Sequence, residues 1–427
     1  MNYEKSLEII YSKILYKKKD DFSNLKKALL LFSNPHNKLK YVHIAGTNGK
    51  GTTSSYVASC LKEAGYKVGL FTSPFVEKFT ERFKINSQEI SEIELAEQLE
   101  KIENTLGSGY DLSFFEYITL IAFNWFLEQN CDIVVLEVGM GGRLDATNII
   151  EKSLVSAICS ISLDHTNFLG NSLSEIAREK SGIIKENSNL VIYPEQKKEA
   201  LDKILEIASE KSANIFVASK DIKIVSESLK GTVFEIENTQ IEILFTGYHQ
   251  VLNASTAFSI IKILNRNGFT INEKSLKNGF KKAKISARQE LICENPIIML
   301  DGGHNPDCAN ALSNVIEKHL KNKKITAIIG MMSDKDCYDY IKIISKKVST
   351  IITVDVDNEK AYKKEYLLEI AQKYCQNSSC SDINTAIINS LESDVIIICG
   401  SMYLMSGIKK NINKIIKERV GKNNANS

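Results

Sequence analysis

The chain has 427 residues, more than one hydrophobic core usually serves, so we expect two domains. Its composition, 43% hydrophobic and 25% charged, is that of a globular protein. The 54 lysines and arginines nearly balance the 52 aspartates and glutamates, and no basic block suggests a track for a polyanion. These numbers exclude nucleic acid as an expected partner.

No segment has the pattern of a membrane span or a secretory signal. The longest apolar stretches, such as 117–126, are far shorter than the roughly 18 residues that a span requires. Residues 1–18 mix charged and apolar side chains without an uninterrupted apolar core. We therefore expect a cytoplasmic protein with no membrane partner. Its nine cysteines are scattered and lack CxxC spacing, which favours reduced, mostly buried thiols over a zinc or redox site.

The first part of the chain alternates short apolar strands with helices, a rhythm typical of a parallel α/β sheet. Ser91 and Glu94 form a capping box that opens one of these helices. Strands are predicted at 41–45, 67–71, 132–137 and 154–160, and helices at 53–64 and 114–129. Alternation over 222–245 then predicts a small antiparallel patch, and helices over 249–284 close this domain.

A second α/β series follows, with a helix over 306–321. Its predicted strands are 296–301, 325–331, 350–354 and 394–399. We place the boundary near residue 290, which gives domains 1–290 and 291–427, the second one Rossmann-like. Both domains are α/β in class, and a cleft between them is the expected place for a ligand.

Residues 43–53 end a strand and open a helix with a glycine-rich, lysine-containing turn. Glycines let backbone N–H groups surround an anion, the helix N-terminus adds partial positive charge, and Lys50 can reach the β and γ phosphates. The strict phosphate-loop pattern is not met, because Gly51 stands where a hydroxyl residue usually follows the lysine. Thr52 or Thr53 must then supply any hydroxyl ligand to a metal.

Polar groups also follow other predicted strands. Glu137 ends an apolar run before a second glycine group, 139–142, which lacks the final glycine of a dinucleotide fingerprint. A carboxylate beside a phosphate loop suits Mg²⁺, which prefers oxygen ligands. His165 follows the next strand, where it could also simply cap or pack. In the second domain, Asp301 precedes two glycines, and Asn305 with Pro306 predicts a helix start facing the ligand.

Taken in order, these motifs resemble the folylpolyglutamate synthase and dihydrofolate synthase family, a branch of the Mur ligase superfamily. The resemblance runs from 46–53 through 72–74, 81–82, 137–148, 163–170 and 178–185 to Asn253, Arg288 and 301–306. It implies a P-loop domain, ATP and Mg²⁺ as cofactors, and a monomer. Gly-Lys-Gly-Thr, Gly-Gly-Arg-Leu-Asp-Ala-Thr-Asn and Asp-His-Thr together separate this branch from the cell-wall ligases.

The resemblance also implies roles for single residues. Gly49, Lys50, Gly51 and Thr52 match the phosphate cradle, and Asn253, Arg288 and Asp301 match nucleotide contacts, the last two coming from the linker and second domain. Ser73, Glu137 and His165 match magnesium ligands. Lys180 matches a lysine that the family carries N-carboxylated, although local sequence alone would make it an ordinary surface lysine. His304 matches the loop on the glutamate side.

The sequence says less about the acceptor substrate than about the type of reaction. Ser113, Phe114, Phe115, Glu116, Asp145 and Ala146 align by order with segments that hold dihydropteroate in bifunctional relatives. An aromatic pair can pack on a pterin while carboxylates accept its ring N–H groups, but Phe114 and Phe115 could equally belong to the core. Two departures stand out: residues 21–27 lack the glycine and arginine common in the pterin loop, and Ser286-Ala287 replaces Pro-Gly before Arg288.

We therefore predict a ligase that uses ATP to convert a folate-type carboxylate into an acyl phosphate, which the amine of L-glutamate attacks. A carboxylate needs this activation because oxide is its leaving group otherwise. The substrates are L-glutamate and a reduced folate, with dihydropteroate as a favoured second acceptor. Two alternatives remain: a Mur-type ligase with another acceptor or amino acid, and a regulatory protein that binds ATP without ligation.

Overall fold

The computed structural model describes residues 1–14, 21–409, 411–412 and 414–415, so positions 15–18 of the N-terminal stretch lie outside the described residues. The chain forms two compact units. The first comprises 1–224, 233–243 and 250–284, and the second comprises 225–232, 244–249 and the chain from Ile285 onward. None of the described helices is both long and apolar enough to cross a membrane.

The first unit is built on an eight-stranded sheet with the order β4-β3-β2-β5-β1-β6-β7-β8. The six strands from β2 to β8 in that order run parallel, and β3 with β4 forms an antiparallel edge. The bounds are β1 Tyr41–Ala45, β2 Val68–Phe71, β3 Phe83–Ile85, β4 Gln88–Glu89, β5 Ile133–Glu137, β6 Val155–Ile158, β7 Asn189–Ile192 and β8 Asn214–Val217. Every residue of β1, β2, β5 and β6 is buried, as continuous apolar runs in a parallel sheet require.

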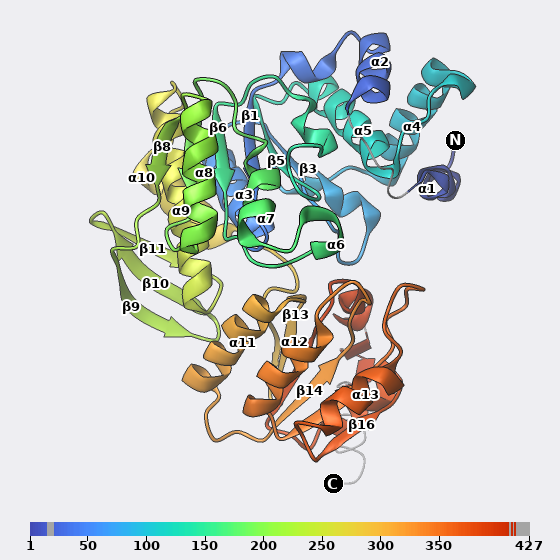
Figure 1. Cartoon of the computed structure of the whole chain (residues 1–427), viewed down its shortest axis with the longest axis vertical. Coiled ribbons are helices and arrows are strands. Elements are labelled where there is room, and N and C mark those ends of the chain that lie inside the picture. The colour runs from blue at the N-terminus through green and yellow to red at the C-terminus, as the bar shows by residue number, and fades with distance from the viewer. Residues whose placement is uncertain (15–20, 410, 413, 416–427) are drawn as a thin grey trace. The chain divides into compact units, whose positions relative to one another are not determined.

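Ten helices among the described residues accompany this sheet (Figure 1). They are α1 Tyr3–Ser12, α2 Ser23–Leu31, α3 Lys50–Glu63, α4 Glu92–Leu106, α5 Phe114–Glu128, α6 Thr166–Leu169, α7 Leu173–Ser181, α8 Lys198–Glu210, α9 Tyr248–Arg266 and α10 Glu273–Lys282. Capping boxes begin α4 at Ser91, as predicted, and α5 at Ser113. Helices α1, α2 and α4 pack around α5, which is buried on most sides.

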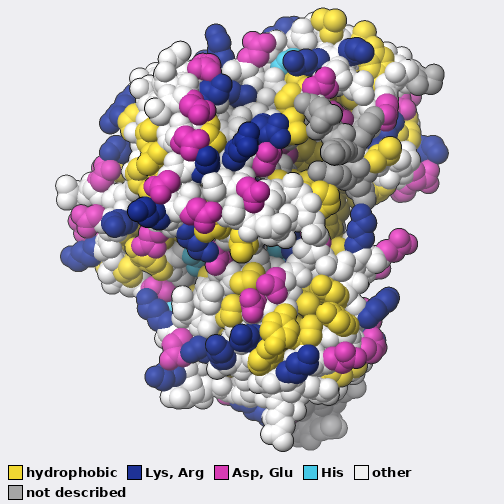
Figure 2. Space-filling model, viewed as in Figure 1, with side chains coloured by type: hydrophobic (Ala, Val, Ile, Leu, Met, Phe, Trp, Pro, Cys, Tyr) yellow, Lys and Arg dark blue, Asp and Glu magenta, His cyan; other side chains and the backbone are white. Residues whose placement is uncertain are grey.

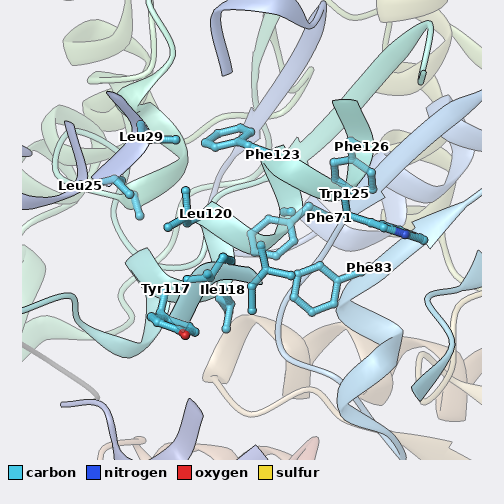
Figure 3. Close-up of a cluster of buried hydrophobic side chains, with 14 of the residues drawn as sticks. Leu25, Leu29, Phe71, Phe83, Tyr117, Ile118, Leu120, Phe123, Trp125 and Phe126 are labelled. Atoms are coloured by element: carbon cyan, nitrogen blue, oxygen red, sulfur yellow. The ribbon is translucent and has the colours of Figure 1, made fainter. Parts of the chain in front are cut away.

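Aromatic side chains dominate the core between α5 and the sheet (Figure 3). Phe71 and Phe83 lie 5.5 Å apart between ring centroids, and Trp125 lies 5.4 Å from Phe126. Burying such large rings contributes about 1.5–3 kcal/mol each by transfer from water. This core fixes the position of α5 beside the sheet, and the residues at the start of α5 are candidates for substrate contact.

A small sheet of β9 Ile222–Ser228, β10 Gly231–Ile236 and β11 Thr239–Ile243 follows, as the antiparallel patch predicted from 222–245. Glu227 of β9, whose side chain is 4% exposed, belongs to the second unit. The Glu227 carboxylate accepts hydrogen bonds from Lys318 Nζ at 2.6 Å and from His319 Nε2 at 2.8 Å. These two charge-assisted contacts fix this segment to the end of a helix of the second unit.

The second unit has a six-stranded sheet with the order β12-β13-β17-β14-β15-β16, in which only β12 is antiparallel to its neighbour. The strands are β12 Glu290–Glu294, β13 Ile297–Asp301, β14 Ile325–Ile329, β15 Thr350–Thr353, β16 Ser378–Cys380 and β17 Val395–Cys399. The helices are α11 Pro306–His319, α12 Cys337–Ile344, α13 Lys364–Gln372 and α14 Ile383–Ser390. Asn305 caps α11 and Pro306 is its first residue, as predicted.

Charged side chains are mixed over the visible face, where lysine and arginine alternate with aspartate and glutamate (Figure 2). All nine cysteines are free thiols, six of them buried.

The elements between 189 and 217 and the β3–β4 hairpin were not predicted. Their strands are only two to four residues long, and β8 and β4 are largely exposed.

Candidate active site

Four parallel strands of the first unit deliver the candidate residues to one edge of the sheet. Ile44 of β1 lies beside Glu137 of β5, and Ala45 lies beside Ile158 of β6. On the other side of β5, Phe71 of β2 pairs with Leu136, just before Ser73. In open α/β sheets, ligands bind outside the carboxyl ends of the strands. The fold therefore places the segments after β1, β2, β5 and β6 where such a ligand binds.

The loop after β1 has the backbone shape of an anion cradle. Gly49 has φ of 87°, in the left-handed region, and is the N-cap of α3, so Lys50 is the first helical residue. A Cβ atom at Gly49 would lie 2.2 Å from Asn253 Oδ1, so only glycine fits here. The N-terminus of a helix, where the first N–H groups have no partner within the helix, favours an anion at this point.

Lys50 is held over this loop by neutral acceptors. Its Nζ donates to the carbonyl oxygens of Gly46 at 3.1 Å and Thr47 at 3.2 Å. The backbone N–H groups of Thr47 and Asn48 in turn donate to Ser160 O, which ties the loop to the segment after β6. Thr52 is buried in the first turn of α3.

Glu137 and Ser73 meet beside the cradle. Glu137 Oε2 accepts a hydrogen bond of 3.1 Å from the backbone N–H of Ser73. A Cβ atom at Gly51 would lie 3.4 Å from the same oxygen. The carboxylate is thus buried close to the helix N-terminus where phosphate oxygens are expected. A magnesium ion that bridges phosphates needs only one or two protein carboxylates, and Glu137 fits that requirement.

Lys180 reaches the same loop from α7. It is buried, and its Nζ donates a hydrogen bond of 2.8 Å to Gly46 O, 134 residues away. Lys50, Glu137 and Lys180 all lie within electrostatic reach of the buried Cys159 thiol, whose pKa burial raises to about 11. The structure therefore brings these three predicted residues together, and Lys180 is not a surface lysine.

The glycine group after β5 sets the position of α7. A Cβ atom at Gly142 would lie 2.7 Å from the carbonyl oxygens of Glu179 and Lys180. Arg143 N donates to Glu179 O at 2.7 Å, and the Arg143 side chain pairs with the Glu179 carboxylate at 3.0 Å. The loop therefore packs directly on the turn of α7 that carries Lys180.

His165 follows β6 in a left-handed conformation, with φ of 49°, and is the N-cap of α6. Its backbone N–H donates to Asp164 Oδ1 at 2.9 Å. Three residues earlier, Ser162 Oγ accepts from Asn48 Nδ2 at 3.0 Å, so this segment is fixed to the loop after β1. Asn253, on α9, contacts that loop through its Oδ1 and donates from Nδ2 to Gln250 Oε1 at 3.1 Å.

The residues predicted to bind the acceptor substrate mostly form hydrogen bonds within their own helix or loop. Ser113 and Glu116 bond each other in the capping box of α5, and both are buried. Asp145 accepts from the N–H groups of Gly139, Met140 and Thr147 and from the Thr147 hydroxyl group. These four bonds occupy the usual acceptor sites of a carboxylate. Burial raises the pKa of Asp145 above its ordinary value in spite of them.

The two phenylalanines differ. Phe114 is buried and stacks on Tyr11, with ring centroids 6.0 Å apart. Phe115 is half-buried and lies against Gly139, where a Cβ atom would be 2.5 Å from its ring. Ala146 is buried in the short helix after Asp145. Phe115 is therefore the aromatic of this pair that reaches the glycine loop after β5.

In the second unit, the candidates gather where β13 ends. The Asp301 carboxylate is buried and accepts from Gly303 N at 2.6 Å, and the Arg288 charge lies within electrostatic reach. Burial raises the pKa of Asp301. His304 Nδ1 lies 3.1 Å from Gly302 O, so this nitrogen carries the proton because a carbonyl can only accept. The arrangement presents one acid, one guanidinium group and one imidazole together.

Sequence reasoning missed several residues that shape these sites. His43, inside β1, lies with its Nε2 2.8 Å from Thr147 Oγ1, and Cys159 packs under Gly46. Lys185, whose pKa burial lowers to about 8, holds the side chain of Asn148 at 2.8 Å. Each sits within an apolar run or a motif already noted, and no pattern in the sequence marks its distant partner.

Comparison with known proteins supports the geometry. The family model of the Mur ligase middle domain matches residues 44–261, and that of the dihydrofolate synthetase C-terminal domain matches residues 284–411. The dihydrofolate synthase/folylpolyglutamate synthase of Bacillus subtilis is 31% identical over 430 residues, which cover 96% of this chain and 99% of the relative. The Escherichia coli protein of the same name is also 31% identical, over 86% of this chain and 85% of its own.

Solved structures also match this chain over almost its whole length. Folylpolyglutamate synthase from Thermotoga maritima has a TM-score of 0.82 at 32% identity and covers 96% of both chains. Escherichia coli FolC in complex with DHPP and ADP has a TM-score of 0.85 at 28% identity, over 97% of this chain and 98% of its own. These matches confirm the predicted α/β fold class and the family resemblance. The chain therefore belongs to the dihydrofolate synthase/folylpolyglutamate synthase family of Mur-type ligases, and it is an ATP-dependent ligase.

Proposed function

We propose that this enzyme joins L-glutamate to a folate-type carboxylate through an acyl phosphate, with release of ADP and phosphate. The observation that carries the proposal is the convergence of Lys50, Glu137 and Lys180 on the loop after β1. Phosphoryl transfer depends mainly on positioning and charge neutralisation, and this edge of the sheet offers a helix N-terminus, an ammonium group and a carboxylate.

Nucleotide binding is assigned to residues of both units. In the first unit, Gly49, Lys50, Gly51 and Thr52 would surround the phosphates, with Asn253 packed on the loop behind them. In the second unit, Arg288 and Asp301 would contact the nucleotide, and His304 would serve the glutamate side. We also propose a domain division near residue 290, just after Arg288, with an ATP-binding domain before it and a glutamate-ligase domain after it.

Magnesium is proposed as the metal, held by Glu137, Ser73 and His165. Among the described residues, no three His, Cys, Asp or Glu side chains are grouped to hold a metal. Mg²⁺ does not need such a group, because it keeps several waters and binds through one or two carboxylates together with substrate phosphates. Bound there, it would neutralise charge on the transferred phosphoryl group.

Lys180 is proposed to carry an N-carboxyl group. Its side chain is buried beside the phosphate cradle, where an ammonium group has little solvent to stabilise it. A carbamate would turn this cation into an additional carboxylate near Glu137. It would thereby strengthen a magnesium site that otherwise has a single carboxylate.

We further propose that both dihydropteroate and tetrahydrofolate serve as acceptors. Phe115 supports this, since it lies half-buried beside Gly139 and could offer a flat ring to a pterin. Ser113, Phe114, Glu116, Asp145 and Ala146 would shape the same wall through their backbone and capping bonds. The E. coli relative was crystallised with DHPP and ADP, which is consistent with an acceptor of this class.

The test is glutamate-dependent ADP release with each acceptor supplied alone. Release with both acceptors supports dual activity, and release with tetrahydrofolate only restricts the enzyme to polyglutamylation. ADP release that does not depend on glutamate would instead support a regulatory ATPase. A requirement for a different amino acid or acceptor would identify another Mur-type ligase.

The small-molecule substrates and the mixed surface charge also support a cytoplasmic monomer. Light scattering after gel filtration tests the monomer, for which the expected mass is 47.8 kDa. A mass of twice this value at working concentration would replace the monomer with a dimer.

A further inference from the structure

His43 is a polar side chain at the centre of the large parallel sheet. It lies in β1, beside Leu136 of β5 and Ser156 of β6, and it is fully buried. Central strands of parallel sheets usually carry apolar residues, and a buried polar group destabilises a fold unless the protein supplies its hydrogen bonds. A histidine at this position must therefore depend on a specific hydrogen-bond partner.

That partner is Thr147, in the short helix Ala146–Ile149 that follows the glycine group. His43 Nε2 lies 2.8 Å from Thr147 Oγ1, and this hydroxyl oxygen lies 2.5 Å from Asp145 Oδ1. The backbone N–H of Thr147 donates to the same carboxylate oxygen at 3.0 Å. All three side chains are buried, so a continuous chain of hydrogen bonds runs from the sheet to Asp145 away from solvent.

The hydrogen bonds of this chain run in one direction. Asp145 also accepts from the N–H groups of Gly139 and Met140, each at 3.0 Å, and these donors favour the ionised carboxylate. The Thr147 hydroxyl group therefore donates to Asp145 and accepts from His43, which places the imidazole proton on Nε2. Within the described residues, Nδ1 of His43 has no hydrogen-bond partner. This fits a nitrogen without a proton, because a buried N–H group rarely lacks an acceptor.

Asp145 holds the loop that lies against Phe115. Through Oδ2 it bonds the first two residues of the segment 139–145 and closes this segment into a loop. A Cβ atom at Gly139 would lie 2.5 Å from the Phe115 ring, so the loop backbone and this ring pack directly together. Rotation of the Asp145 carboxylate would therefore shift the surface on which Phe115 rests.

We propose that His43 and Thr147 are positioning residues for the acceptor substrate. The His43 imidazole orients the Thr147 hydroxyl group, that hydroxyl group orients Asp145, and Asp145 holds Gly139 against Phe115. The inference rests on the proposed contact between Phe115 and the pterin ring. A carboxylate that bonds only its own loop would in this way still affect acceptor binding.

Thr147→Val tests the proposal, because valine has the shape of threonine without its hydroxyl group. We expect KM for tetrahydrofolate to rise roughly fivefold while KM for ATP stays within about twofold of the wild-type value. Thr147→Ser, which restores the hydroxyl group, should return KM for tetrahydrofolate to within about twofold. Thr326→Val is the matched control, since it removes a buried hydroxyl group that hydrogen-bonds Ser393 in the second unit. Both valine variants should lose thermal stability, but only Thr147→Val should change KM for tetrahydrofolate.

Two variants of His43 repeat the test from the other end of the chain. The amide nitrogen of glutamine can take the place of Nε2, whereas the shorter asparagine cannot reach Thr147. His43→Asn should therefore raise KM for tetrahydrofolate, and His43→Gln should keep it near the wild-type value. In His43→Asn, adding Thr147→Val should change this KM by less than about twofold, because both substitutions break the same chain. The His43 pair also decides the matter if Thr147→Val fails to fold.

An unchanged KM for tetrahydrofolate in folded Thr147→Val overturns the proposal. An equal rise in both KM values also overturns it, because it would indicate a loosened sheet edge rather than a displaced loop. Phe115→Ala, assayed alongside, separates this inference from the function on which it rests. If Phe115→Ala raises KM for tetrahydrofolate and Thr147→Val does not, only the roles of His43 and Thr147 are lost. If neither variant raises it, the acceptor assignment of Phe115 fails as well.

Discussion

The Lys180 ammonium group donates a hydrogen bond of 2.8 Å to the carbonyl oxygen of Gly46. The Lys50 ammonium group donates to that same oxygen at 3.1 Å. Two cations on one neutral acceptor repel each other, and either an anion in the cradle or loss of one charge would relieve the repulsion. Bound phosphate would draw Lys50 away, and carboxylation would reverse the charge of Lys180.

Lys50→Ala should lower turnover at least 100-fold, because the variant loses the cation placed at the phosphate cradle. Unfolding free energy should change by less than about 1 kcal/mol, since Lys50 bonds only backbone carbonyls at the loop surface. ADP release and urea unfolding are measured on the same preparations. Lys62→Ala, at the other end of α3, is the control and should keep wild-type turnover. Normal turnover in folded Lys50→Ala would remove the phosphate-loop assignment.

Lys180 should show a carbamate signal in ¹³C NMR when ¹³C-bicarbonate is supplied with ATP. Carbamates form on neutral amines, and Lys185 is a rival site because burial lowers its pKa to about 8. The signal should disappear in Lys180→Met and remain in Lys185→Met. The opposite pattern would place the modification on Lys185, and no signal in the wild type would argue against a carbamate.

Gly142→Ala should lower activity by displacing Lys180. The added methyl group would lie 2.7 Å from two carbonyl oxygens of α7, and overpacking of this kind costs about 1–3 kcal/mol. We expect kcat to fall more than tenfold in a protein that still folds at 25 °C. Gly109→Ala is the control, since a Cβ atom there meets no atom within 4 Å. Unchanged kcat in Gly142→Ala would mean that α7 can shift without consequence.

Phe115→Ala should raise KM for the pterin acceptor at least fivefold while KM for ATP stays within twofold, because the loss is confined to one aromatic wall. Initial rates with each substrate varied in turn give both constants. Phe168→Ala, an exposed phenylalanine, is the control. If both KM values rise together, Phe115 acts on the fold or on α5 rather than on the acceptor.

His43 should make stability fall with acidification. Burial lowers its pKa well below the ordinary value, so the folded protein keeps it neutral. Below pH 6.5, approximately, the unfolded chain binds a proton that the folded chain refuses, which costs up to about 1.4 kcal/mol per pH unit. His43→Gln should therefore show a shallower loss of unfolding free energy between pH 6.5 and 5. An equal slope in urea melts at several pH values would exclude His43 as the source.

The sequence was most informative where local chemistry decides the structure. Apolar runs placed β1 and β5, and Ser91 and Asn305 marked helix starts that the structure confirms. It was least informative about which distant groups meet. Asp145 is an example, since the loop order suggests a ligand carboxylate but its oxygens bond the loop itself. Lys180 is another, because its burial and its contact with Gly46 come from a segment that no spacing relates to it.

Alkylation of the buried Cys159 thiol can report on motion of the phosphate loop. Its Cβ leaves no room for a side chain at Gly46, and its thiol bonds Thr53 of α3 at 3.4 Å. An alkylating reagent can reach this sulfur only when the loop lifts away, whereas the half-buried thiols of Cys293, Cys308 and Cys380 stay more accessible. The labelling rate at Cys159 thus measures how often the loop after β1 opens in the absence of ATP. Saturating ATP should slow labelling at Cys159 more than at the other three thiols.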